Sequence, residues 1–330
     1  METAVKKMIS MLPKLYIACI ALLSFYANSQ DSFPNKPIRI VVPFAPGASD
    51  VQIRALAPLL SAKLGQSIII ENMPGGGGVI AANAVKLAKP DGYTLFFTGM
   101  ATVTMVPSLR KDISYSLKDF APLGNISSIT GVMIVHPSNN YKNLKELIQY
   151  ARENPGKLNY GTPGIGTAGH TFGVGPQVYG DFLLTHIPYK GGSEVVAAVI
   201  GGNVDVGFVL PNIAMSHLPG GSIKAFAITA SKRSEFLPDV PTYRELGINY
   251  VDGESYGILG PKDLPPQVIQ KISAAIAEAS ADSNFKELMR KSAISVEYLN
   301  PEQYKSLLLE REVAWNQHLN NPKFLDLIKK

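Results

Sequence analysis

The sequence has a single cysteine, Cys19, and few charged residues, which make up 17% of its 330 positions. One cysteine cannot close an intramolecular disulfide, so the chain is not a disulfide-stabilised scaffold. The small charged fraction, beside 46% hydrophobic residues, excludes an intrinsically disordered chain. Glycine and proline, at 29 and 24 residues, are too few for a collagen-like or low-complexity protein. The chain is therefore globular, and its length suits two domains of roughly 100–200 residues each.

Signals for nucleic-acid binding, metal binding and catalysis are also missing. The formal net charge is only +5 and no run of basic residues stands out, which argues against nucleic acid as a partner. The sequence contains no G-x-S-x-G elbow and no H-E-x-x-H motif, and its five histidines lack the spacing of metal ligands. We therefore expect a protein without a metal, a cofactor or an enzymatic activity. A catalytic site assembled from distant residues is the alternative, because such sites are recognised by geometry.

The N-terminal residues have the pattern of a secretory signal peptide. Three lysines precede a short apolar run at 15–25, which is followed by Ala27-Asn28-Ser29. A positive segment, a short apolar segment and small residues before a cleavage point define such a signal. The run is shorter than the ~20 apolar residues that a spanning helix needs. We expect residues 1–29, Cys19 included, to be removed on export; an uncleaved membrane anchor is the alternative.

The first part of the remaining chain alternates between strand and helix patterns. Apolar strands are predicted at 38–42, 67–71 and 93–98, and helices at 51–64 and 79–88. Strand, helix, strand, helix, strand is typical of a parallel sheet with right-handed crossovers. The sequence therefore predicts a first α/β unit.

The middle of the chain repeats this alternation, and the last third is helical. Strands are predicted at 131–135, 157–160, 183–187, 204–209 and 224–229, and helices at 144–153, 170–179 and 194–200; further helices are predicted at 265–280, 284–292 and 301–319. The segments 127–131 and 252–257 are interpreted as passages between the two units. Two passages place the second unit, residues 129–255, inside the first, residues 30–128 and 256–330. A cleft between two such units is a natural ligand site.

The loop 43–50 joins the first strand to the first helix. In an open α/β sheet, ligands bind beyond the carboxyl ends of the strands, where helix N-termini offer free N–H groups and a partial positive charge. A carboxylate or phosphate would suit this loop, with Ser49 and backbone amides as donors. The structural alternative is that Asp50 caps the helix and Gly47 eases the turn.

A second loop, 161–170, lies between a strand and a helix and contains G-x-G-x-x-G at Gly164, Gly166 and Gly169. A dinucleotide site would also need an acidic residue ~20 positions further on, and that region reads His186-Ile187-Pro188-Tyr189-Lys190. An anion-binding loop with the hydroxyls of Thr162 and Thr167 fits better. His170 is the one histidine in a candidate loop.

Two further side chains are candidates for the same cleft. Tyr189 precedes a predicted helix and could face the cleft. Asp205 interrupts an apolar strand, and a buried carboxylate needs partners. Asp205 is therefore interpreted either as a structural carboxylate that bonds loop amides or as a group aimed at a ligand.

Several motifs in fixed order resemble a known family, the extracytoplasmic solute receptors of tripartite tricarboxylate transporters, of the Bug type. The resemblance extends from about residue 33 to the C-terminus. The motifs are Pro43-Phe44-Ala45-Pro46-Gly47 with Asp50, Glu71-Asn72-Met73-Pro74-Gly75-Gly76-Gly77-Gly78, Pro90-Asp91-Gly92-Tyr93-Thr94-Leu95, Lys118-Asp119-Phe120-Ala121-Pro122, Pro188-Tyr189-Lys190-Gly191 and Leu237-Pro238-Asp239-Val240-Pro241-Thr242.

The resemblance implies a type II periplasmic-binding-protein fold, with two α/β lobes, a ligand cleft between them and C-terminal helices packed on the first lobe. It implies a periplasmic, monomeric receptor that hands a small carboxylate to membrane permease subunits; signalling to a sensor kinase is the alternative. In that family loop amides, hydroxyls and ordered waters hold the ligand. The positions carried over are Phe44, Ala45, Gly47, Ala48, Ser49, Asp50, Thr98 and Gly99 in the first lobe, and Thr162, Gly166, Thr167, His170, Tyr189 and Asp205 in the second.

The sequence departs from the family pattern in three places. The first loop reads Gly47-Ala48-Ser49-Asp50, one residue shorter than usual, and Val106-Pro107 stands where Asn-Pro is common. Gly173, Gly175 and Pro176 lie where a regular helix should follow His170, so this helix is expected to start badly or to bend. Each departure could change the size or polarity of the ligand.

Overall fold

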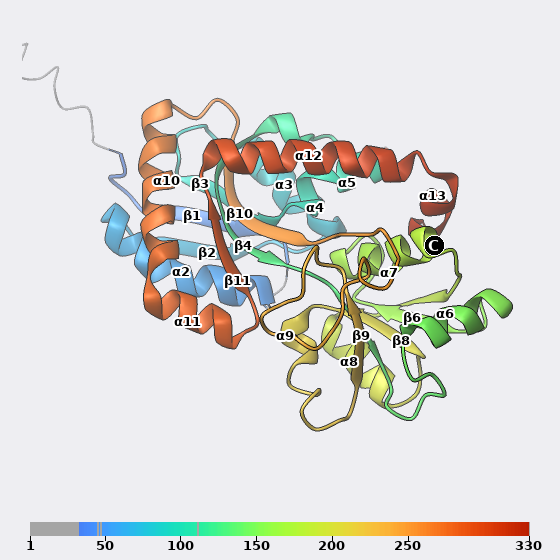
Figure 1. The fold of residues 1–330 in the computed structure, drawn as a ribbon. Coiled ribbons are helices and arrows are strands. Elements are labelled where there is room, and N and C mark those ends of the chain that lie inside the picture. The colour runs from blue at the N-terminus through green and yellow to red at the C-terminus, as the bar shows by residue number, and fades with distance from the viewer. Residues whose placement is uncertain (1–32, 45, 47, 111, 330) are drawn as a thin grey trace, which may run out of the picture.

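The chain forms two β-sheets, each covered by helices, and it crosses from one sheet to the other and back (Figure 1). The computed structural model describes residues 33–44, 46, 48–110 and 112–329. The predicted signal peptide and the candidate residues Ala45 and Gly47 lie outside the described residues, so these predictions stay predictions.

The first lobe contains a six-stranded sheet in the order β11-β4-β10-β3-β1-β2. β1 is parallel to β2 and β3, whereas β10 runs antiparallel to β3 and β4. The strands are β1 (Ile38–Val42), β2 (Ile68–Asn72), β3 (Thr94–Gly99), β4 (Phe120–Ile129), β10 (Glu254–Pro261) and β11 (Ser295–Leu299).

Helices bury both faces of this sheet, which explains why its central strands are continuously apolar. Ile40 and Phe97 face one apolar core, and their neighbours Val41 and Phe96 face another. The first core is closed by α2 (Ala48–Leu64), α10 (Pro266–Ala281) and α11 (Ser283–Lys291). The second core is closed by α3 (Val79–Lys86), α4 (Ala101–Thr104) and α12 (Pro301–Leu319), with α5 (Val106–Leu109) and the short helices η1 (Gly76–Gly78) and η2 (Leu117–Asp119) nearby.

The second lobe contains a five-stranded sheet in the order β7-β6-β8-β5-β9. β6 is parallel to β7 and β8, and β5 runs antiparallel to β8 and β9. The elements are β5 (Val132–Val135), α6 (Leu144–Glu153), β6 (Asn159–Thr162), α7 (Ala168–Tyr179), β7 (Thr185–Pro188), α8 (Gly192–Ile200), β8 (Val206–Val209), α9 (Pro211–Ala214) and β9 (Lys224–Ile228).

The strand register determines which edges of the two sheets face each other. Tyr256 pairs with both Gly99 and Ser127, so β3 and β4 end at the same edge, from which the chain crosses to the second lobe. There Val132, the first residue of β5, pairs with Val209, the last of β8. The carboxyl ends of the parallel strands in both sheets therefore lie at the edge where the chain crosses.

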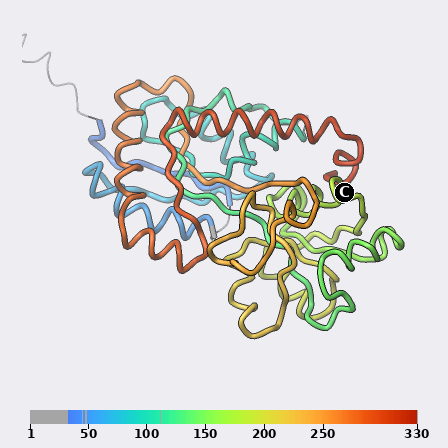
Figure 2. The backbone as a smooth tube through the Cα atoms, viewed as in Figure 1, coloured from blue at the N-terminus to red at the C-terminus, as the bar shows by residue number. Residues whose placement is uncertain are grey.

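The C-terminal helices connect the two lobes a third time. α12 packs on β4 and α4 of the first lobe, and α13 (Pro322–Ile328) packs on α7 of the second (Figures 1 and 2). The expectation of packing on the first lobe therefore describes α10, α11 and α12 but not α13. The connecting apolar cluster contains Met105, Val174, Trp315, Phe324, Leu327 and Ile328.

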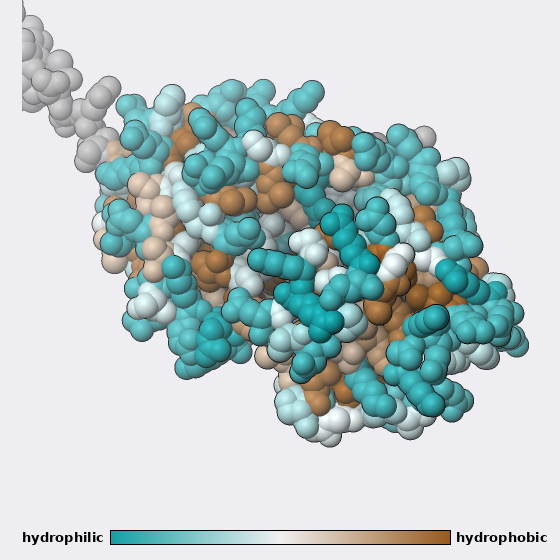
Figure 3. All heavy atoms as spheres, in the orientation of Figure 1, coloured by the Kyte–Doolittle hydropathy of each residue, from teal (hydrophilic) through white to brown (hydrophobic). Residues whose placement is uncertain are grey.

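One face of the molecule illustrates how polar and apolar residues are distributed on the surface. Figure 3 shows a face dominated by hydrophilic residues, with hydrophobic residues gathered in small patches. Within the described part of the chain, no helix has the length and apolar character needed to cross a membrane.

Helix α7 is continuous over twelve residues despite Gly173, Gly175 and Pro176. The helix begins at Ala168 with Thr167 as its N-cap, so the expected poor start is not found. The glycines serve close packing. A Cβ atom at Gly173 would lie 2.7 Å from Tyr160, and one at Gly175 would lie 2.0 Å from Tyr250. These aromatic rings pack against the helix backbone, so a side chain at either glycine would displace them.

We predict that Gly175→Ala lowers the free energy of unfolding by about 1–3 kcal/mol, the range for overpacking a well-packed interior. The new methyl group would collide with Tyr250, whose hydroxyl lies 2.8 Å from Asp252 Oδ2 at the second crossing. Urea denaturation measures the loss. Gly220→Ala is the control, because a Cβ there meets only Ser222 Oγ at 3.8 Å. Equal stability of the two variants would contradict the packing argument.

Candidate functional site

The loop after β1 is held in shape by a polar network centred on Asp50. Asp50 is 5% exposed; its Oδ2 accepts a hydrogen bond from Arg54 Nε (2.6 Å) and its Oδ1 one from Asn72 Nδ2 (2.8 Å). Asn72 Nδ2 also donates to the Phe44 carbonyl at 2.9 Å. Burial acts to raise the pKa of the Asp50 carboxyl, but the bonds from Arg54 and Asn72 lower it below its ordinary value. Asp50 is therefore ionised, and both of its carboxylate oxygens accept hydrogen bonds that stabilise the shape of the loop.

The remaining first-lobe candidates lie at the same carboxyl edge. Ser49 is in the first turn of α2 and is 8% exposed. Thr98 and Gly99 end β3, where the Thr98 hydroxyl donates to the Gly99 carbonyl at 3.2 Å. Ala48 begins α2, and its side chain lies outside the described part of the structure. Phe44, Ser49 and the end of β3 thus all lie at the carboxyl edge of this sheet.

A buried carboxyl that the sequence analysis did not single out, Glu254, adjoins the end of β3. Its Oε1 accepts a hydrogen bond from Ala101 N at 3.2 Å, and a Cβ at Gly99 would lie 2.8 Å from its carboxyl carbon. Burial raises the pKa of Glu254 to about 8, and the nearby Asp252 adds to the increase. Near neutral pH, Glu254 is therefore mostly protonated and can act as a hydrogen-bond donor at this edge.

In the second lobe, the side chains of the loop after β6 are committed to the loop itself. Thr167 caps α7: its Oγ1 donates to the Gly164 carbonyl (2.7 Å) and accepts from His170 N (3.4 Å). Thr162 Oγ1 lies 2.7 Å from His186 Nε2. These hydroxyls fix the course of the loop, and their contact with a ligand stays a prediction.

His170 is buried and supports the same loop from inside. Its Nδ1 accepts a hydrogen bond from Gly166 N at 3.2 Å, and its ring stacks on His186 with centroids 4.1 Å apart. Burial, aided by His186, lowers the pKa of His170 to about 3. The ring is therefore neutral and able to accept, so it orders the Gly166 amide and offers no positive charge.

The first turn of α7 leaves backbone donors at the carboxyl edge. Neither Ala168 N nor Gly169 N donates to another residue that the structure describes, as expected for the start of a helix. Ile165, in the same loop, is 52% exposed. Amides supported by Thr167 and His170 are thus the groups that this loop can offer to an anion.

Tyr189 belongs to this cluster, whereas Asp205 does not. Tyr189 N donates to the Thr162 carbonyl at 2.9 Å, and a Cβ at Gly161 would lie 3.1 Å from the Tyr189 ring. Asp205 precedes β8, so it lies at the opposite, amino edge of the sheet, where its Oδ2 accepts from Asn159 N at 2.8 Å. The structure corrects the placement of Asp205: it is a structural carboxylate, the first of the two interpretations of its sequence context.

The lobes touch at the carboxyl edges and at the second crossing. Leu210, next to the end of β8, packs against apolar clusters of both lobes. At the crossing, Arg311 of α12 forms an ion pair with Asp252, and Thr171 of α7 lies within hydrogen-bond distance of the same carboxylate (2.8 Å). Among the described residues, no group of acidic, histidine or cysteine side chains could hold a metal ion.

Two α/β lobes, linked by two crossings of the chain and turning the carboxyl edges of their sheets toward each other, have the architecture of a two-lobed solute-binding protein. The family described as "Tripartite tricarboxylate transporter family receptor" (TctC) matches residues 52–321, so the chain belongs to this family of periplasmic, non-enzymatic receptors. The family resemblance inferred from the motifs is thereby confirmed. The expectation that the protein is a binding protein and not an enzyme is confirmed by the same match.

Similar proteins agree with this assignment. A protein of Cupriavidus necator, "UPF0065 protein in gbd 5'region", is 35% identical over 295 residues, covering 89% of this chain and 90% of its own length. The structure of the periplasmic binding protein BugD is 30% identical, with a TM-score of 0.77 over 87% of this chain and 98% of its own. MatC from Rhodopseudomonas palustris, determined with bound malate, is 28% identical, with a TM-score of 0.76 over 90% of this chain and 100% of its own. The predicted periplasmic-binding-protein fold is confirmed.

We predict that Glu254→Gln changes the pH dependence of stability. Because the pKa of Glu254 is raised from 4.5 to about 8 in the folded state, the folded protein binds more protons in this window, and its stability falls as the pH rises. A neutral glutamine removes this loss, so the variant should gain roughly 2–4 kcal/mol relative to the wild type between about pH 5 and about pH 8.

Urea denaturation at the two pH values measures the difference. Glu297→Gln is the control, because Glu297 is exposed on β11 and its loss should leave the pH profile of the wild type unchanged. A constant stability difference between Glu254→Gln and the wild type at both pH values would contradict the prediction.

Proposed function

We propose that this protein captures a small carboxylate between its two lobes and delivers it to the membrane subunits of a tripartite transporter. The observation that carries the proposal is the strand register, which directs the carboxyl ends of β1, β3, β6 and β8 toward the crossing edge. Helices α2 and α7 begin at that edge, and ligands of open α/β sheets bind there. The malate bound to the related MatC supports the ligand class.

In the proposed complex, backbone amides provide most of the charge complementarity. α7 offers the amides of Ala168 and Gly169, and each long helix places roughly half a positive charge at its N-terminus. From the first lobe, Phe44, Ser49 and the end of β3 would face the same ligand. Glu254, when protonated, adds a donor or an acceptor. Phe44 and Tyr189 provide apolar walls for the carbon chain of the ligand.

Ligand capture would close the lobes about the two crossings. The chain passes between the lobes at residues 130–131 and again before Glu254, and these two short passages are the proposed hinges. Hinge closure around a ligand is a common mode of domain movement. The signal peptide predicted at residues 1–29 would bring the receptor to the periplasm, where the membrane subunits can be reached.

We predict that a small carboxylate raises the melting temperature of the purified protein. A ligand at 100 times its dissociation constant adds ~2.7 kcal/mol of stability, which should raise the melting temperature by a few degrees. Thermal-shift measurements with a panel of mono-, di- and tricarboxylates, with the matching amides as controls, identify the class. A protein that mass spectrometry finds free of co-purified ligand and that responds to no carboxylate would contradict the proposal.

We predict that Ala168→Pro weakens carboxylate binding without unfolding α7. Proline is favoured at the first helical position, and Thr167 before it already has the extended backbone (φ −85°, ψ 163°) that a residue preceding proline adopts. The change removes one N–H donor, so affinity should fall by about 1.5–3 kcal/mol, the range for a hydrogen bond to a charged group. Isothermal titration calorimetry measures the loss.

The matched control is Ser283→Pro, which places proline at the same position of α11, after Asp282 (φ −59°, ψ 131°). This helix packs against α10, away from the crossing edge. The control variant should bind the ligand as the wild type does. If both variants retain full affinity, the Ala168 amide does not contact the ligand.

A further inference from the structure

Glu254 lies beside the end of β3, at the edge where the proposed ligand site forms. It is the first residue of β10 after the second crossing, and it is 5% exposed. Its Oε1 accepts a hydrogen bond from Ala101 N, at the start of α4 (3.2 Å). Gly99 leaves the space that the carboxyl group occupies, because a Cβ there would lie 2.8 Å from the carboxyl carbon. The glycine at the end of β3 therefore allows an acidic group to lie against the proposed site.

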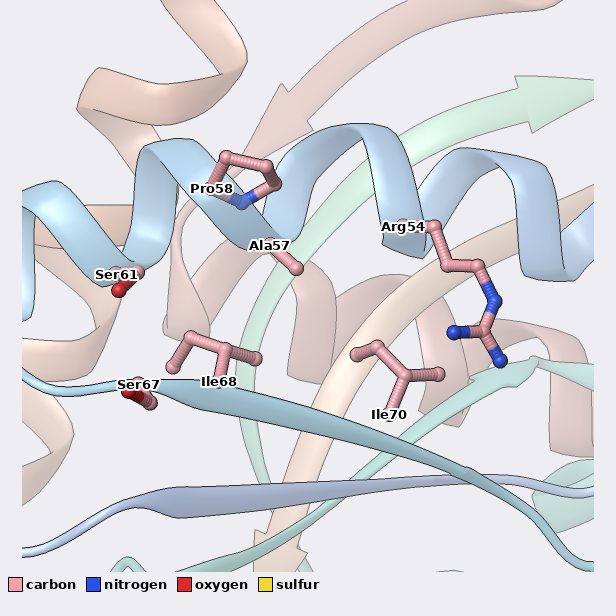
Figure 4. A pocket seen from close by; sticks show the side chains of 7 residues that line it. All are labelled: Arg54, Ala57, Pro58, Ser61, Ser67, Ile68 and Ile70. Atoms are coloured by element: carbon pink, nitrogen blue, oxygen red, sulfur yellow. The ribbon is translucent and has the colours of Figure 1, made fainter.

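The basic side chains on the neighbouring helices are paired with other groups. Arg311 of α12 forms its ion pair with Asp252, and Arg54 of α2 forms one with Asp50. Figure 4 shows Arg54 beside the groove between α2 and β2, and β1 and β3 separate β2 from β10 in the sheet. Within the described part of the chain, Glu254 takes part in no ion pair. An ionised Glu254 would therefore be a buried carboxylate without a cation beside it, which is costly.

The titratable groups that face Glu254 come from the second crossing, from β10 itself and from α12. Burial raises the pKa of Glu254 to about 8, the charge of Asp252 adds to the increase, and the charge of Arg311 acts against it. The pKa values of Tyr256 and Tyr304 are raised by burial and, to a smaller extent, by Glu254, so both rings are neutral in the same range. In the free protein near neutral pH, Glu254 is therefore largely a neutral carboxylic acid.

We propose that Glu254 binds the ligand carboxylate as a neutral acid and donates a hydrogen bond to one of its oxygens. The inference rests on the proposed function, since it needs an anion at this edge. Two carboxylates held side by side repel each other, so one of them must be protonated. Because Oε1 already accepts from Ala101 N, the proton belongs on Oε2. The ligand keeps its negative charge for the helix N-termini, and capture is linked to the protonation of Glu254.

This linkage makes the affinity depend on pH in one direction. Below about pH 7 the free protein already carries the proton, so the affinity should be constant. Above about pH 8 the free protein loses the proton and must regain it on binding, so the dissociation constant should rise roughly tenfold between about pH 6.5 and about pH 9. Simple carboxylic acids are ionised throughout this range. The change in affinity therefore reports a group of the protein.

Isothermal titration calorimetry at about pH 6.5 and about pH 9 tests the linkage, with malate first and then each other carboxylate of the thermal-shift panel. The wild type should lose roughly tenfold in affinity at the higher pH. In buffers that differ in ionisation enthalpy, it should also take up about one proton per bound carboxylate near pH 9. Glu297→Gln is the control, because Glu297 is exposed on β11, and this variant should follow the wild type.

Two substitutions of Glu254 separate the proton from the donor. Glu254→Gln keeps an uncharged donor, so its affinity should match that of the wild type within about threefold at about pH 6.5 and stay constant to about pH 9. Glu254→Leu has no donor and should bind at least about tenfold more weakly at both pH values. Melting temperatures verify that both variants are folded under the conditions of the titration.

Infrared difference spectroscopy distinguishes direct contact from an indirect effect on the crossing. At about pH 6.5 the carbonyl band of protonated Glu254, identified by its loss in Glu254→Gln, should shift when a carboxylate binds, because the acid gains an acceptor. An unshifted band overturns the contact.

The outcomes for the inference and for the proposed function differ. Equal affinity of the wild type at both pH values, or a pH dependence that Glu254→Gln retains, overturns the inference and leaves the proposed function standing. Failure of every carboxylate in the panel to bind at about pH 6.5 overturns the proposed function and the inference with it.

Discussion

The contact between the two lobes at the second crossing is organised around one buried carboxylate, Asp252. Its side chain is 4% exposed and lies beside the guanidinium of Arg311, the hydroxyls of Thr171 and Tyr250, and the amide of Gly253. A buried charge is costly unless it is paired and hydrogen-bonded, so these donors must remain assembled in the folded protein. Because they come from the second crossing and from helices of both lobes, the carboxylate ties α7, α12 and the crossing segment to one point. These bonds help to hold the carboxyl edges of the two sheets in their positions facing each other.

The candidate site uses its side chains to shape loops and its backbone to offer donors. Asp50, Thr167 and His170 all turn their polar atoms toward neighbouring loop atoms. What remains at the edge is a set of amides at helix starts. In the proposed complex, such a site would recognise the carboxylate group by geometry and leave the rest of the ligand to the surrounding walls.

Local patterns in the sequence predicted the alternating elements, the two lobes and the loops at their carboxyl ends, because hydrophobic period and helix-start residues are local signals. Local patterns could not predict contacts between residues that are far apart in the sequence. Gly175 packs on Tyr250 and Arg311 pairs with Asp252, and neither partner can be deduced from spacing. The strands β4, β10 and β11 were not predicted, and the ends of β4 and β10 at the crossing edge were interpreted as parts of the passages 127–131 and 252–257. Asp205 was placed among site candidates because an alternation pattern does not reveal which end of a strand reaches the ligand.

The third connection between the lobes has a spectroscopic consequence. Trp315 is the only tryptophan in the sequence, and it is 4% exposed in the cluster that joins α12 and α13 to α7. All of the indole emission of the protein therefore originates at the seam between the lobes. A movement of the second lobe that shifts α7 against α12 and α13 would change the packing around that ring. Its fluorescence would then report such a movement without a dye or a mutation.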